Sequence, residues 1–359
     1  MSNLKKLGLQ FIKYFLTDKD FSQINAARIV WNGCKIQLCL WHAKKSIKKK
    51  LADNSKPKLN NYNSIEANSK LSFIDIQWFP IIPPNSPFIF CPKKLHIQII
   101  ELFTKHFHLH PLIPVENGEF LSYIDIWKLS TKEMYNFCYE NDLKYAWAYM
   151  WCNWYRFDLW LLWARAATPD EICIFKTTML VESHWKVVKR NYLSGFFRPR
   201  LDLVTFIIIT RLIPHYEIMY NKYQIGREKA AWRKDFKKNW KDLAKKEFSG
   251  KLYYVNTDQW ICSCPAFLTN RFFLCKHLVK SVNNIITPEF FDNVQRQGTY
   301  PLLGMLPKEQ NHFNAILLGK EGTERTEEVE IEEVGVDGIE GIEGNLILKI
   351  LCLLSIKFI

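Results

Sequence analysis

The first twenty residues, MSNLKKLGLQFIKYFLTDKD, lack the long apolar run and small-residue cleavage site of a secretory signal peptide. This absence predicts an intracellular protein, nuclear or cytoplasmic, in which the ten cysteines stay reduced. Reduced cysteines bind metals more often than they form disulfides. The sequence therefore argues against a small disulfide-stabilised secreted domain, and clusters of cysteine and histidine become the first candidates for a functional site.

The C-terminal tail and the aromatic run in the middle of the chain both lack the features of a membrane-spanning helix. A membrane-spanning helix needs about 20 apolar residues. The tail 345–359 is shorter and is interrupted by Lys349 and Lys357, and the aromatic run 144–164 contains several strongly polar residues. Membrane association is therefore disfavoured. A packed terminal helix, or an irregular end of the reading frame, explains the tail better than an anchor does.

The chain is rich in aromatic residues and in positive charge. Its 359 residues are 48% hydrophobic and 15% aromatic, which is enough to bury the cores of about two domains. Lysine and arginine together exceed aspartate and glutamate by 13. Such a charge favours association with a polyanion, either nucleic acid or an anionic membrane surface.

Hydrophobic periodicity organises the first half of the chain. Residues 8–42 follow the pattern of strand, helix and strand, and a lysine-rich helix comes next. Residues 52–95 are rich in asparagine, serine and proline, which predicts loops and extended segments. From 95 to 165 the pattern is helical, with bulky aromatic faces. A further helix is expected to begin near Thr177 or Thr178.

The segment 222–251 is strongly basic, with eleven lysines and arginines against four acids. Its large apolar residues recur at helical spacing along one stripe: Trp232, Phe236, Trp240 and Leu243. This pattern predicts an amphipathic helix that packs the stripe into a core and leaves its lysines in water. Those lysines remain free to contact nucleic acid. Further on, residues 321–345 are acidic, repetitive and glycine-rich, which is typical of a disordered segment.

Four potential soft-metal ligands lie within residues 260–279, WICSCPAFLTNRFFLCKHLV. Cys262 and Cys264 form a C-x-C pair in an expected strand, and Cys275 and His277 form a C-x-H pair at the expected start of a helix. Zn²⁺ prefers a tetrahedral set of thiolate and imidazole ligands. Four protein ligands would make the site structural and closed to substrate. The alternative is that the two pairs fell together by chance in a buried helix–loop unit.

This segment resembles the SWIM-type zinc finger, whose pattern is C-x-C, a variable loop and C-x-H. Trp260, Pro265 and the CKHL sequence also fit, over about residues 251–280. The resemblance implies contact with DNA or protein, and a zinc ion bound by Cys262, Cys264, Cys275 and His277.

SWIM fingers often follow a transposase core, and residues 5–200 resemble the Mutator-like element (MULE) transposase domain. The resemblance rests on TDKD, CLWH and VESHWK in that order. It implies an RNase H-like fold with a large all-α insertion and a DDE triad of carboxylates. Asp18 matches the second Asp, Glu182 matches the final Glu, and Cys39 and His42 match a C-x-x-H element of the family.

In such a site two metal ions about 4 Å apart activate water or a 3′-hydroxyl and stabilise the leaving oxygen. Mg²⁺ is the natural ion because it prefers carboxylate oxygens, and Asp18 and Glu182 would anchor it. The family's first Asp lies upstream of everything in this chain, which starts at Met1. We therefore expect a truncated or domesticated transposase, or an incomplete gene model, that is inactive alone. Mg²⁺ would bind only in a longer parent.

Simpler explanations exist for each of these residues. An Asp at the end of a strand is most often a helix N-cap, which applies to Asp18, since it precedes the expected helix. Asp20 is a less likely alternative to Asp18 as the second Asp of the triad. Cys39 and His42 could be ordinary buried residues. The histidines of HFHLH, residues 106–110, alternate as in a strand. Since they have no acidic or cysteine neighbour in the sequence, a solvated or a packed position explains them better than a metal does.

The expected fold class is α/β followed by α: a partial RNase H-like core with a large all-α insertion, and then a small SWIM-type zinc finger. The expected domains are the transposase-like domain 1–200 with its insertion at about 71–170, a basic helical connector 201–250, the finger 251–285, a helical or loop extension 286–320, the acidic segment 321–345 and the apolar tail 346–359.

Three functions stay open on the sequence. The first is a zinc-binding, DNA-binding protein derived from a transposase, with an incomplete DDE site. The second is a fragment of an active DDE transposase that cuts and joins DNA with Mg²⁺. The third is a zinc-stabilised module that binds other proteins through the finger. The basic charge favours the first two, and the missing first Asp favours the first.

Overall fold

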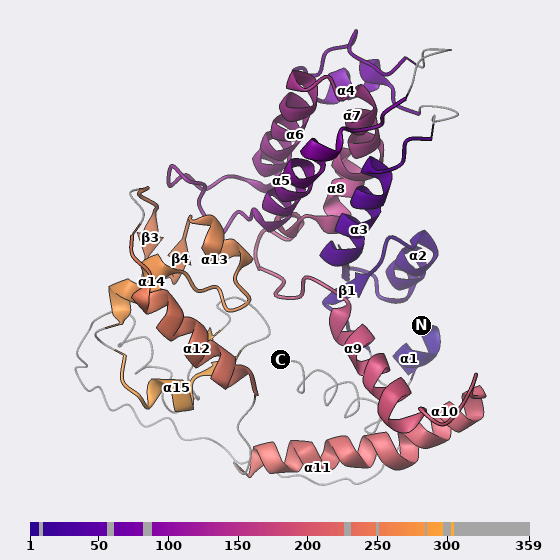
Figure 1. Cartoon of the computed structure of the whole chain (residues 1–359), viewed down its shortest axis with the longest axis vertical. Coiled ribbons are helices and arrows are strands. Elements are labelled where there is room, and N and C mark those ends of the chain that lie inside the picture. Colours follow the sequence, from indigo (N-terminus) through magenta and orange to yellow (C-terminus); the bar gives the residue numbers. More distant parts are fainter. Residues whose placement is uncertain are drawn as a thin grey trace.

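The computed structural model describes residues 1–6, 10–55, 61–81, 88–225, 231–248, 251–283, 286–296 and 303–304. Helices dominate these residues and the strands are short (Figure 1). The predictions for the acidic segment 321–345 and for the apolar tail 346–359 concern residues outside this described part.

The α-helices are α1 (Ser2–Lys6), α2 (Phe21–Val30), α3 (Leu40–Leu51), α4 (Ser64–Lys70), α5 (His96–His108), α6 (Tyr123–Glu140), α7 (Lys144–Met150), α8 (Phe157–Trp163), α9 (Met179–Val187), α10 (Leu201–Ile207), α11 (Ile213–Gln224), α12 (Ala231–Lys245), α13 (Pro265–Thr269), α14 (Lys276–Val282) and α15 (Phe290–Asn293). Short 3₁₀ turns are η1 (Lys93–Leu95) and η3 (Arg165–Ala167), and π-helical turns are η2 (Trp151–Tyr155), η4 (Val188–Tyr192) and η5 (Ile208–Leu212). The strands are β1 (Tyr14–Thr17), β2 (Lys35–Leu38), β3 (Val255–Asn256), β4 (Ile261–Cys262), β5 (Gln295–Arg296) and β6 (Leu303–Gly304).

The N-terminal strands form a parallel pair joined by a helix. β1 and β2 run parallel with Phe15 opposite Ile36, and α2 connects them. The strand, helix, strand and helix predicted up to Leu51 are therefore confirmed. The carboxylate of Asp20 starts α2 by accepting hydrogen bonds from the backbone N–H groups of Ser22 and Gln23, at 2.9 and 3.3 Å. Asp20 is thus the N-cap of this helix, which leaves Asp18 available for another role.

A bundle built from α3 and from α5 to α8 forms the main body (Figure 1). Large aromatic side chains fill its core, including Trp147, Trp154, Trp160 and Trp163, each no more than 1% exposed. The prediction of crowded helices between residues 95 and 165 is confirmed. Within the predicted loop region 52–95 the structure adds α4, which begins where the Asn63 side chain accepts hydrogen bonds from two backbone N–H groups of the first turn.

The HFHLH segment ends a helix, so the expected strand is wrong there. Residues up to His108 belong to α5, and His106, His108 and His110 are all buried. The His106 ring lies 2.6 Å from the Tyr155 hydroxyl and 2.9 Å from the carboxylate of Glu133 on α6. Burial lowers the pKa of His106. Packing explains this group, as expected, although the fold supplies an acidic partner that the local sequence does not contain.

The helices that follow the body extend away from it (Figure 1). α9 runs from the end of the sheet to a long helix made of α10, η5 and α11, and the two share a small apolar core: Val188, Leu193, Ile207, Leu212 and Tyr216. Among the described residues, the run Leu201–Lys222 is long and apolar enough to cross a membrane by length and composition. Core helices of soluble proteins also meet these two criteria.

Candidate metal centre

Two short structural units bring the C-x-C and C-x-H pairs together. β4 pairs antiparallel with β3, Cys262 opposite Val255, and Ser263 prolongs the pairing through its backbone N–H to the Tyr254 carbonyl. α13 begins directly after Cys264, with Pro265 in its first turn. After the loop, Cys275 is the N-cap of α14, and His277 lies in the first turn of that helix.

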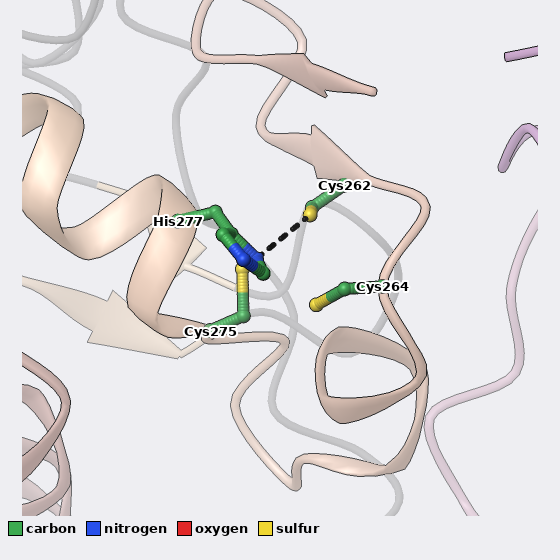
Figure 2. Close-up of side chains that lie close together, drawn as sticks. All are labelled: Cys262, Cys264, Cys275 and His277. Atoms are coloured by element: carbon green, nitrogen blue, oxygen red, sulfur yellow. Dashed lines mark hydrogen bonds between the residues drawn. The ribbon is translucent and has the colours of Figure 1, made fainter. Parts of the chain in front are cut away.

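The four side chains converge on one point (Figure 2). One ligand atom from each of Cys262, Cys264, Cys275 and His277 lies within 4.8 Å of every other. Each of the four residues is no more than 8% exposed. The structure thus brings together all four predicted ligands, and it forms a buried cluster of three cysteines and one histidine of the zinc-finger kind.

The dimensions of this cluster fit a tetrahedral zinc ion. With Zn–S of about 2.3 Å and Zn–N of about 2.0 Å, neighbouring ligand atoms stand about 3.5 to 3.8 Å apart. The Cys262 sulfur lies 3.7 Å from Nδ1 of His277. Within the described residues, Nε2 of His277 is buried without a hydrogen-bond partner. Such a buried polar atom is costly unless a ligand satisfies the ring, so the residues present fit zinc.

The three sulfurs share hydrogen bonds, which favour the thiolate form that binds zinc at Cys264 and raise the pKa values of Cys262 and Cys275. The pKa of Cys264 is lowered because the thiols of Cys262 and Cys275 donate hydrogen bonds to its sulfur. The sulfur of Cys275 accepts a hydrogen bond of 3.5 Å from the backbone N–H of Leu278, at the start of α14. A bound ion would hold the three thiolates and the imidazole together as a structural link between β4 and α14.

The predicted amphipathic helix α12 packs against this cluster. Its stripe is buried: Phe236 is fully buried, and Trp240 and Leu243 are 2% and 7% exposed. The indole of Trp240 stacks on that of Trp260 at 5.9 Å, and Trp260 directly precedes β4. The helix expected to act as a connector therefore belongs to the hydrophobic core around the cluster. We call α12, β3, β4, α13, α14 and α15 the zinc module.

Contacts with the helical body hold the zinc module in place. The guanidinium of Arg165 lies 5.6 Å from the ring centres of both Phe107 in the body and Phe273 in the module. The Lys176 ammonium donates a 2.9 Å hydrogen bond to the carbonyl of Thr269 at the end of α13. Sequence patterns did not identify these links, because they join residues about a hundred positions apart.

The other predicted site residues also meet in space. Asp18 follows β1, Cys39 is the N-cap of α3, His42 lies in the first turn of α3, and Glu182 is on α9. Oδ1 of Asp18 lies 2.7 Å from Nδ1 of His42, and Oε1 of Glu182 lies 3.4 Å from Nε2 of the same ring. The imidazole thus stands between the two carboxylates that the transposase resemblance selects.

Thr178, the residue before α9, contacts both Cys39 and His42. Its backbone N–H and its hydroxyl donate to the sulfur of Cys39 at 3.3 and 3.4 Å, and its hydroxyl lies 3.3 Å from Nδ1 of His42. A backbone hydrogen bond from Leu40 to Lys176 adds to this contact. The C-x-x-H element therefore anchors the helix that carries Glu182. The sequence placed Thr178 near a helix start but contained no signal of its contact with Cys39.

Comparison with known proteins finds a relative of established name. The chain is 21% identical to mating-type protein ALPHA3 of Kluyveromyces lactis over 308 residues, which cover 75% of this chain and 34% of that protein. The matched chain thus spans about a third of the length of this relative. No family model matches the chain, and no solved structure matches it.

Proposed function

We propose that this chain is a zinc-binding, DNA-binding protein of the nucleus that is derived from a MULE-type transposase and carries a SWIM-type finger. The observation that carries the proposal is the buried cluster of Cys262, Cys264, Cys275 and His277. Its ligand order, C-x-C followed by C-x-H, is the SWIM order. The ion supplies a structural crosslink when bound, because four protein ligands leave no open position for chemistry.

The arrangement of the N-terminal residues supports the transposase part of the proposal. A parallel strand, helix and strand unit leads into α3, as a partial RNase H-like core requires. Asp18 and Glu182, 164 positions apart in the chain, meet on opposite nitrogens of the same imidazole. This meeting also favours a second candidate, DNA strand cleavage with Mg²⁺ in a longer parent protein. Strand transfer by the parent that survives Glu182→Gln would rule out Glu182 as the catalytic carboxylate.

The charge of the zinc module supports DNA as the partner. On α12 four exposed lysines, Lys234, Lys238, Lys241 and Lys245, fall within about 60° of one another at 3.6 residues per turn. This lysine stripe lies on the helix face opposite the buried aromatic stripe. A straight row of cations on a rigid helix can follow phosphates along one groove edge.

Zinc content tests the first half of the proposal. The protein should bind a stoichiometric zinc ion in the finger, and Cys275→Ser should abolish that ion because a buried ligand is lost. Cys138→Ser, a change of a buried cysteine in the main body, is the matched control and should keep it. If Cys275→Ser retains the finger ion, the zinc assignment is wrong.

The salt dependence of DNA binding tests the second half. Each phosphate contact contributes about 0.9 to the slope of log K against log salt. Replacing the four lysines of the stripe by glutamine should lower that slope by about 3.6 if each contacts one phosphate. A control with glutamine at Lys93, Lys94, Lys128 and Lys132, which are exposed in the body, removes the same charge. Equal loss of slope in both proteins would show that only total charge matters; binding that is insensitive to salt would favour a protein partner.

A further inference from the structure

A second group of metal-ligating side chains lies outside the zinc module. Ligand atoms of Asp18, Cys39 and His42 all lie within 4.8 Å of one another. These residues come from the end of β1 and from the start of α3, so the parallel strand pair brings them to one edge of the sheet. The group combines a carboxylate, a thiol and an imidazole, a donor set that differs from the all-carboxylate set of a magnesium site.

The His42 ring is oriented as a metal ligand usually is. Histidines that bind metals commonly donate their other ring N–H to a carboxylate, which fixes the ring and raises its basicity. Here Nδ1 faces Asp18 at 2.7 Å and Nε2 faces Glu182 at 3.4 Å. An ion between Nδ1 and Asp18 would have Glu182 as the outer carboxylate. The Asp18 carboxylate, which is about half exposed, can move outward by the roughly 0.5 Å that tetrahedral ligand spacing requires.

The Cys39 sulfur is buried and accepts two hydrogen bonds. Its residue is 1% exposed, and the Thr178 backbone N–H and hydroxyl both donate to the sulfur. Cys39 is also the N-cap of α3, a helix of twelve residues, where the helix dipole favours an anion. A thiolate at this position would select a transition metal over Mg²⁺.

We propose that Asp18, Cys39 and Nδ1 of His42 bind one divalent transition-metal ion, with Glu182 orienting the imidazole. Three protein ligands leave the fourth position to water or to an oxygen of a bound ligand. That position faces solvent, because the side chains of Asp18 and His42 are 53% and 26% exposed. This proposal does not depend on the finger or on DNA binding, so it can be tested separately from the proposed function.

Cobalt binding to the full chain with its finger already loaded with zinc tests the site. One further equivalent of Co²⁺ should bind and produce the near-ultraviolet charge-transfer band of a single thiolate. A hundredfold excess of Mg²⁺ should leave the band in place. Absence of the band in the wild-type protein, or its loss to Mg²⁺, would overturn the proposal without any variant being needed.

Variants then assign the ligands. Cys39→Ser should remove the band, and His42→Asn should remove the second ion, while both keep the finger zinc that reports a folded module. Cys34→Ser is the matched control and should keep both ions. Cys34 is half-buried at the opposite end of β2, and its sulfur contacts only the Ala27 carbonyl among the described hydrogen-bond partners. Glu182→Gln should keep the ion but weaken its affinity about 10- to 100-fold. A second ion that persists in both ligand variants would show that it binds elsewhere.

Discussion

Replacing Trp240 by alanine should weaken zinc binding although Trp240 is not a ligand. Trp240 is 2% exposed, stacks on Trp260 and lies 5.5 Å from the ring of Phe290. Its indole N–H donates a 3.2 Å hydrogen bond to Asn283, just beyond α14. The side chain therefore contacts both units that carry ligands: β4, at the turn that precedes it, and α14, just beyond its end.

The size of the effect follows from burial. Truncating a buried tryptophan to alanine typically costs about 3 to 5 kcal/mol through lost contacts and the cavity left behind. Because zinc binding is coupled to folding of a small module, this loss should appear in the zinc affinity. At about 1.4 kcal/mol per factor of ten, the dissociation constant should rise roughly 100- to 4,000-fold.

Competition with a chelator of known zinc affinity measures this change. Trp185→Ala is the matched control, because Trp185 lies on α9, outside the zinc module, and is 43% exposed; it should change the finger affinity less than about threefold, as surface substitutions do. An equally small change for Trp240→Ala would refute the reasoning. In that case α12 and the ligand-bearing segments would not form one cooperative unit.

Three further predictions concern residues outside the zinc module. Asp20→Ala should lower the free energy of unfolding by about 1 kcal/mol through loss of the α2 cap, and Asp20→Asn, which keeps an acceptor, should change it by only a few tenths; urea denaturation measures both. Gly33 has φ +89°, and a methyl group added at its Cα would meet no other atom within 4 Å among the described residues. Gly33→Ala should therefore lower the free energy of unfolding by about 1 kcal/mol through backbone strain alone, and Gly33→Asn should lower it less. Burial would raise the pKa of Glu133, but hydrogen bonds from His106 and Lys105 outweigh it and hold it at about 2, below its ordinary 4.5. Its folded pKa is thus depressed, so the stability it contributes is present above pH 4.5 and is lost as the pH falls toward 2; thermal melts across this window should show a flatter acid dependence for Glu133→Gln.

The finger ligands were predictable because their geometry is local. A C-x-C pair in a strand places both sulfurs on one face, and a C-x-H pair at a helix start places its side chains in one turn. The two pairs are ten residues apart, so a single loop can bring them together. For the same reason the β1, α2, β2 and α3 pattern was readable from hydrophobic periodicity, and so was the buried stripe of α12.

Local spacing was misleading where a polar side chain had two possible uses. Asp18 and Asp20 both stand between β1 and α2, and only the backbone conformation decides that Asp20 caps the helix. The HFHLH alternation suits a strand, yet these residues end α5, where burial against α6 and η2 outweighs local preference. The α4 helix lies in a segment of loop-forming composition. Asn63 followed by Ser64 and Glu66 is nevertheless a helix start signal from which this helix could have been predicted.

Contacts between residues far apart in the sequence could be identified only from the tertiary structure. Cys39 and Thr178 are 139 residues apart, and Glu133 and His106 are 27 apart. No short-range pattern encodes such pairs, because their distance depends on how whole helices pack in the aromatic core. Spacing within a turn or a strand thus suffices to name the zinc ligands, whereas the packing of α3, α9 and α12 decides which residues stand around His42 and which helix encloses the zinc cluster.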